Sequence, residues 1–387
     1  MKKVFALILA VMMVLSMFAG CGNASAGNAA EDDAPAVIKV GTSGPLTGDY
    51  AVYGVAVANG LELAFEEINA LGGLQFEVNA QDDEADGEKA VNAYNTLMDW
   101  GMQIMAGPTT SGSALAAAAK CVEEGVFMLT PSASDAGVIA TGDNVFQICF
   151  TDPNQGVGSA DYINNYKPDA VIGVIYDSSN PYSVGIYEKF ISQAEANGMN
   201  VACIVDFTAD NKADLSTQIT KCQEAGCDMV FLPIYAAEAT QILTQAAKVG
   251  YETEFFGCDG LDGILSIEGF DPALAEGVML LTPFDATASD EKTQNFVKNY
   301  TEKYGIAPNQ FAADAYDVAY AIYQACVAGN VTADMSPEEI CQIMIAQFTS
   351  MSFDGLTGSG MTWGADGAVS KMPLAVVIEN GVYVGVE

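Results

Sequence analysis

Small hydroxyl residues follow two apolar segments of the chain, at points where a strand would give way to a helix. One turn, residues 107–113, reads Gly-Pro-Thr-Thr-Ser-Gly-Ser, and the other, residues 130–135, reads Thr-Pro-Ser-Ala-Ser-Asp. Such residues cap helices, and the free N–H groups and positive dipole end at a helix start favour an anion. Simple capping explains any single turn of this kind. Two of them, on adjacent strands facing one cleft, favour a carboxylate site.

Two residue types are absent from the chain, which contains no histidine and no arginine. Without histidine there is no Ser-His-Asp triad, no Cys-His pair and no imidazole zinc ligand. Without arginine, a bound carboxylate cannot be held by a bidentate guanidinium group. An anion site must therefore use hydroxyls, backbone N–H groups at helix starts or a lysine. We expect no enzyme activity, no metal site and no cofactor.

The composition also limits the partners of the chain. The formal net charge is −36, and so acidic a surface repels nucleic acid and anionic membranes. Apart from Cys21, eight cysteines lie in apolar segments without a CxxC pair. They are either buried free thiols or disulfides, and the sequence leaves both possibilities open.

The beginning of the chain has the pattern of an export signal. Two lysines precede an apolar run over residues 4–19, which is short for a membrane span. We predict a signal peptide over residues 1–20. Residues 18–21, Phe-Ala-Gly-Cys, look like a bacterial lipobox, which implies a lipidated Cys21 on the outer face of the cell membrane. The Ala-, Asn- and acid-rich residues 21–35 then form a flexible tether. A signal anchor is the alternative interpretation.

The remaining chain, long enough for two domains, alternates between short apolar strands and amphipathic helices. Strands are predicted at 37–42, 75–80, 102–106, 126–130, 145–150, 170–176, 201–207, 229–234, 254–257, 278–282 and 374–379. Helices are predicted at 51–70, 87–100, 113–125, 183–197, 214–225, 238–249, 290–304, 311–328 and 337–347. This alternation indicates parallel sheets with helices on both faces. The pattern restarts near residue 170, which indicates two lobes, with ligand sites beyond the carboxyl ends of the strands.

Several segments, in order, resemble the periplasmic leucine/isoleucine/valine-binding proteins of type I fold. They are Ser43-Gly44-Pro45 with Tyr53-Gly54, Gln81-Asp82-Asp83, Gly107 to Ser111, Thr130 to Ser134, Phe256 to Gly260 and Ala313 to Asp317. The resemblance covers essentially the whole chain after the tether. It implies an α/β fold of two lobes, each a mostly parallel sheet flanked by helices, joined by a multi-strand hinge. Residues 36–151 and 284–353 would form the N-terminal lobe, and residues 152–283 and 354–387 the C-terminal lobe.

The resemblance also implies roles for individual residues. Ser111 and Ser134 would hold a ligand carboxylate, and the Ser132 backbone would contact both the carboxylate and the ammonium group. Asp259 would neutralise the ammonium group, although the family usually has glutamate there and a proline where this chain has Cys258. Aromatic side chains would enclose the ligand: Tyr53 on the first lobe, and Tyr182 and Tyr235 on the second.

The expected function is therefore that of the family. A monomeric receptor would bind a small, branched-chain or other apolar amino acid between closing lobes and deliver it to the permease of an ABC importer. Two alternatives stay open: another small polar ligand, such as an amide or polar amino acid, and service to a sensory system. The shorter acid at Asp259 leaves the ligand's identity undetermined.

Overall fold

The computed structural model describes residues 36–386. The predicted signal peptide, the lipidation site Cys21 and the tether over residues 21–35 lie outside the described residues. Among the helices of residues 36–386, none combines the length and the apolar character that a membrane span requires.

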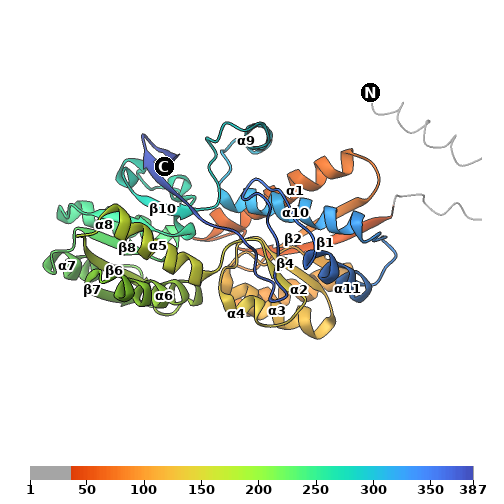
Figure 1. Ribbon diagram of the computed structural model, residues 1–387, viewed down its shortest axis with the longest axis horizontal. Helices are drawn as coiled ribbons and strands as arrows, with labels where there is room; N and C mark the ends of the chain where they lie inside the picture. The colour runs from red at the N-terminus through yellow and green to blue at the C-terminus, as the bar shows by residue number, and fades with distance from the viewer. Residues whose placement is uncertain (1–35, 387) are drawn as a thin grey trace, which may run out of the picture. The chain divides into compact units, whose positions relative to one another are not determined.

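Five parallel strands build the first sheet in the order β2-β1-β3-β4-β5. They are β1 (Val37–Gly44), β2 (Gln75–Asp82), β3 (Ile104–Met105), β4 (Phe127–Thr130) and β5 (Val145–Gln147). Helices α2 (Gly87–Trp100) and α3 (Ser111–Glu124) pack on one face. Helices α1 (Ala51–Ala70), α10 (Gln310–Ala328) and α11 (Pro337–Phe348) pack on the other, with α1 and α10 side by side (Figure 1).

Seven strands build the second sheet in the order β12-β11-β10-β9-β8-β6-β7. The parallel strands are β6 (Val171–Asp177), β7 (Asn200–Phe207), β8 (Met229–Leu232), β9 (Glu254–Gly257) and β10 (Met279–Thr282). The antiparallel pair β11 (Leu374–Glu379) and β12 (Val382–Gly385) closes one edge. Helices α5 (Asp152–Tyr166) and α6 (Pro181–Asn197) cover one face, and α7 (Ser216–Glu224) and α8 (Ala236–Val249) the other.

The chain crosses between the two lobes three times. It leaves the first sheet after β5, returns after β10 to α9 (Glu291–Tyr304) and α10, and crosses again before β11. These crossings confirm the predicted two-lobed α/β fold with a multi-strand hinge. Most predicted elements match within a few residues, whereas α5, the short helix α4 (Ala136–Ile139) and β12 were not predicted.

The tail of the chain departs from the division of lobes expected from the sequence. Residues 354–387 were assigned to the second lobe, but Leu356 and Thr357 donate their N–H groups to the Asp317 carboxylate of α10 at 2.7 and 2.9 Å. Further along, the Trp363 indole donates to the Gln147 carbonyl at 2.8 Å. A buried carboxylate needs such donors. The segment 356–371 therefore packs on the first lobe, and only residues from β11 onwards join the second sheet.

Candidate functional site

Asp259 lies directly after β9, at the carboxyl end of a parallel strand, where this fold class places its ligands. Its side chain is only 3% exposed. The Tyr182 hydroxyl donates to Asp259 Oδ1 at 2.8 Å, and the Asp259 N–H donates to Gln155 Oε1 at 3.2 Å. Burial raises the pKa of Asp259 to about 7, and the hydrogen bonds from Tyr182 and Gln155 oppose that rise. A bound cation would restore the ionised form.

Aromatic rings from both lobes surround this carboxylate. Tyr235, the residue before α8, stacks on Tyr182 with ring centroids 4.8 Å apart. Tyr53 of α1 contacts Phe311 of α10 edge-on at 4.7 Å. The Tyr53 hydroxyl crosses between lobes, donating to the Gly260 carbonyl at 2.6 Å and accepting the Ala236 N–H at 2.7 Å. These rings give the site apolar walls.

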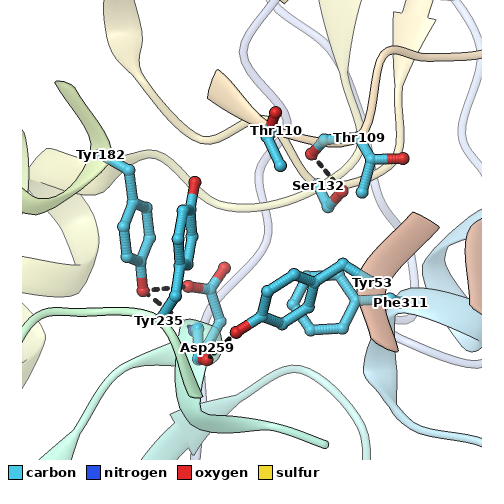
Figure 2. A pocket seen from close by; sticks show the side chains of 9 residues that line it. Tyr53, Thr109, Thr110, Ser132, Tyr182, Tyr235, Asp259 and Phe311 are labelled. Atoms are coloured by element: carbon cyan, nitrogen blue, oxygen red, sulfur yellow. Dashed lines mark hydrogen bonds between the residues drawn. The ribbon is translucent and has the colours of Figure 1, made fainter. Parts of the chain in front are cut away.

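Hydroxyl groups of the first lobe lie on the side opposite Asp259 (Figure 2). Thr110 is the residue before α3, where its side chain makes no capping hydrogen bond, and its Oγ1 is buried without a partner among the described residues. Ser132, in the turn after β4, donates its hydroxyl to the Thr109 carbonyl at 2.7 Å. The first N–H groups of a helix have no intrahelical partner. The α3 start therefore offers hydrogen-bond donors to an anion.

These residues line a cavity between the lobes. Its lining consists of Tyr53, Thr109, Thr110, Ser132, Tyr182, Tyr235, Asp259, Gly260 and Phe311, so that Asp259 is the only acidic group and no lysine takes part. The cavity volume is about 10 Å³, roughly what a single water needs. A larger ligand enters only if the lobes separate or the rings turn. The chemistry of the lining suits a small molecule with one cationic end, one hydrogen-bonding end and an apolar body.

The structure brings five of the seven predicted site residues to this cavity: Tyr53, Ser132, Tyr182, Tyr235 and Asp259. The other two, Ser111 and Ser134, do not line it. The Ser111 hydroxyl accepts the Asp135 N–H at 3.3 Å, and Ser134 is buried beside the Asp152 carboxylate.

Thr109, Thr110 and Phe311 line the cavity but were not predicted. Thr110 was missed because the resemblance assigned the carboxylate to Ser111, which the structure places as the first residue of α3. The side chain that precedes the helix therefore belongs to Thr110. The hydroxyl turn itself was the signal that could have identified it.

Comparison with known proteins places this geometry among binding proteins. The leucine-, isoleucine-, valine-, threonine- and alanine-binding protein of Pseudomonas aeruginosa is 28% identical over 340 residues, covering 87% of this chain and 88% of that protein. A leucine-binding protein of Thermotoga maritima superposes with a TM-score of 0.81 at 25% identity, covering 91% of this chain and 98% of that one. The isoleucine complex of a branched-chain amino acid transporter substrate-binding protein from Streptococcus pneumoniae gives 0.80 at 27% identity, covering 90% and 100%.

The family model described as periplasmic binding protein matches residues 37–381, nearly all of the described chain. Members of this family are substrate-binding components of transporters and not enzymes, and they act outside the cytoplasm. The match includes every strand of both sheets except β12, all three crossings and every residue that lines the cavity. This chain belongs to the periplasmic binding protein family.

Proposed function

We propose that this chain is the extracytoplasmic substrate-binding lipoprotein of an ABC importer and that it captures a small apolar amino acid between its lobes. The observation that carries the proposal is the position of Asp259. It is the one charged side chain in the cavity lining, and it lies opposite the hydroxyls of Thr110 and Ser132. A zwitterion matches this arrangement, with its ammonium group at the acid and its carboxylate at the neutral donors.

The ligand's side chain would lie among the rings of Tyr53, Tyr235 and Phe311. Apolar walls of this kind favour an aliphatic side chain over a charged one. The ligands named for the Pseudomonas protein, and the isoleucine bound to the Streptococcus protein, support a branched-chain ligand.

Each predicted residue has a place in this proposal. Asp259 pairs with the ammonium group, assisted by Tyr182. Ser132 and Ser111 contribute to carboxylate binding, Ser111 through its N–H at the first position of α3. Ser134 acts from behind the cavity, beside the buried Asp152.

The anchor belongs to the proposal as well. We infer lipidation of Cys21, which would hold the receptor near its permease on the outer face of the membrane, with residues 21–35 as the tether. Stable anchoring requires more than one acyl chain. Replacing Cys21 with serine should release the protein from the membrane fraction and leave ligand affinity unchanged. A mutant that stays in the pellet would indicate a signal anchor.

Calorimetry on the chain without its signal segment tests the binding function. Titration with each proteinogenic L-amino acid should give a saturable signal for at least one aliphatic member. Ligand at about a hundredfold over its Kd should stabilise the fold by roughly 2.7 kcal/mol. Failure of all of them to bind would overturn the proposal. Binding only of amides or polar amino acids would overturn the apolar assignment alone.

A sensory role uses the same site and differs only in the partner. Uptake of the labelled ligand by cells with and without this protein separates the two. Loss of uptake supports the importer, and normal uptake with a lost transcriptional or motility response supports the sensor.

A further inference from the structure

One of the polar contacts that join the lobes outside the cavity involves three side chains. Tyr50, the residue before α1 on the first lobe, donates its hydroxyl to Glu238 Oε1 of α8 at 2.7 Å. Lys212, in the connection from β7 to α7, donates to the same Tyr50 hydroxyl at 2.9 Å and to Glu238 Oε1 at 2.8 Å. The three groups form a closed hydrogen-bonded triangle, which we call the 50–212–238 triangle.

The two charged members lie on one lobe. Lys212 and Glu238 both belong to the second lobe, and their ion pair is well shielded, since the Glu238 side chain is only 3% exposed. Glu238 also lies in the first turn of α8, where the helix dipole favours a negative charge. The pair therefore persists when the lobes separate. Within the triangle, Tyr50 is the member that belongs to the first lobe, and its neighbour Asp49 places Oδ2 3.8 Å from Lys212 Nζ.

The Tyr50 ring connects this contact to the cavity wall. It packs edge-on against Tyr235 with centroids 5.2 Å apart, and Lys212 Nζ lies 4.8 Å from the Tyr50 ring centroid. None of the three residues of the triangle lines the cavity. They consequently influence a ligand through lobe closure and not through direct contact.

We propose that the 50–212–238 triangle is an interlobe latch that stabilises the closed form and sets how long the ligand is retained. This proposal rests on the proposed function in one respect: the bound amino acid is the ligand whose dissociation is measured. A contact present in the closed form alone shifts the closing equilibrium by its own free energy, and apparent affinity changes by the same factor. The change falls on dissociation, because the encounter occurs with the open form.

Tyr50→Phe tests the latch, since it keeps the ring packing and removes only the hydroxyl. We expect the dissociation rate of the amino acid identified by calorimetry, measured by stopped-flow fluorescence, to rise by about tenfold to a hundredfold, the range expected for loss of one charge-assisted hydrogen bond. The association rate should stay within about twofold. The order of preference among ligands should not change.

Tyr316→Phe is the matched control. Tyr316 donates to Glu67, so this variant also removes a hydrogen bond from tyrosine to glutamate, but one whose partners, α10 and α1, belong to the same lobe. It should lower the thermal stability and leave the dissociation rate unchanged. If the ligand dissociates at the same rate from the wild type and from Tyr50→Phe, the latch proposal is wrong.

Lys212→Met provides a second variant, which should act non-additively with Tyr50→Phe because both belong to one network. Additive effects would contradict a single latch.

A distance measurement keeps the proposal testable without any ligand. Spin labels at Leu71→Cys on the first lobe and Val249→Cys on the second, both exposed positions, report lobe separation on a Cys203→Ser background. Tyr50→Phe should enlarge the population of long distances relative to wild type. If wild type binds no amino acid yet this shift is seen, the proposed ligand fails and the latch stands. If the distances do not change, the latch fails.

Discussion

Asp259 is held by neutral groups only: the Tyr182 hydroxyl, and the Gln155 side chain at its N–H. If a ligand ammonium group supplies the opposite charge, Asp259→Asn keeps the shape and removes the attraction. Loss of one partner from a desolvated ion pair costs about 2–5 kcal/mol. Affinity should then fall roughly 30-fold or more. Calorimetry on folded protein measures this, and a change of only a few-fold would remove the ammonium assignment.

The same carboxyl group predicts how binding depends on pH. Burial raises the pKa of Asp259 to about 7, so a large fraction is neutral in mild acid. Only the ionised form pairs with ammonium. Affinity should rise between about pH 5.5 and about pH 8, by up to about tenfold per unit below the pKa, and level off above it. Titrations in buffers of different ionisation enthalpy should detect proton release. Asp259→Asn should bind with little pH dependence; an equal slope in this variant would implicate another group.

Among the residues that line the cavity, the acid and most of the aromatic side chains were predicted from the sequence, but not every hydroxyl group. Tyr53 could be predicted because its type matches the family, and Asp259 because an acid follows the same strand, although the family usually has glutamate there. Thr110 was not predicted, because the resemblance pointed to Ser111, and only the observed start of α3 at Ser111 shows that Thr110 precedes the helix. The predicted start at residue 113 differs by two residues from the observed one, and a shift of this size, which helix propensity does not resolve, changes which side chain precedes the helix.

Helices α1 and α10 pack closely against each other at Gly60 of α1. A Cβ atom on Gly60 would lie 2.3 Å from the carbonyl oxygen of Ala312. Because a backbone oxygen cannot turn aside as a side chain can, Gly60→Ala must push the helices apart. We expect it to lower the free energy of unfolding by about 1–3 kcal/mol. Urea denaturation followed by circular dichroism measures the loss.

Gly158 gives the matched control for that substitution. It lies within α5, and its added Cβ would meet Leu281 only at 3.4 Å, an ordinary contact. Alanine also has the better helix propensity, so Gly158→Ala should be neutral or stabilising by up to about 1 kcal/mol. A comparable loss in both variants would mean that close packing is not the cause.

Helix α5 shows why some elements escape prediction from sequence. Its segment contains Pro153, Gly156 and Gly158, which are poor helix formers. Close packing explains why residue 156 is glycine, since a Cβ there would lie 2.5 Å from the carbonyl oxygen of Ile186 in α6. Thr151 caps the helix, and proline suits its first turn. Tertiary packing thus outweighs local propensity, whereas helices with a regular apolar stripe, such as α1, could be predicted to the residue.

For the whole molecule, buried acids predict how stability responds to pH. Burial raises the pKa of Asp259 to about 7 and of Asp262 to about 6, and raises that of Asp152 well above its ordinary value. The folded chain therefore keeps protons that the unfolded chain releases. Their contribution is fully present below about pH 4 and is lost as pH rises through the folded-state pKa values.

We accordingly expect the ligand-free protein to be more stable at about pH 5 than at about pH 7.5, by a few kcal/mol, with each unit of pKa shift equivalent to about 1.4 kcal/mol. The net charge of −36 acts in the same direction, because protonation reduces self-repulsion. Differential scanning calorimetry across this pH range measures the change in stability. Asp262→Asn should flatten the dependence. A stability maximum near neutral pH would show that these carboxyls are better compensated than their burial implies.

The tail, residues 354–387, was assigned to the second lobe, but its segment 356–371 packs on the first. Residues 354–373 contain glycines and no periodic apolar pattern, so nothing local indicates which lobe they join. Their placement depends on single distant partners. One is the Asp317 carboxylate; another is Asp314, which forms a buried ion pair with Lys371 at 2.6 Å.

The three crossings also affect how the protein is made. While the chain emerges from the ribosome, β1 to β5 are complete long before α10, α11 and segment 356–371, which cover and close the same lobe. Until those late segments are synthesised, α1 alone covers this face of the first sheet. Contacts between segments so far apart in sequence form slowly. We therefore expect the first lobe to stay incompletely folded while the chain is still being synthesised, and an incompletely folded chain is the form that a narrow secretion channel can thread.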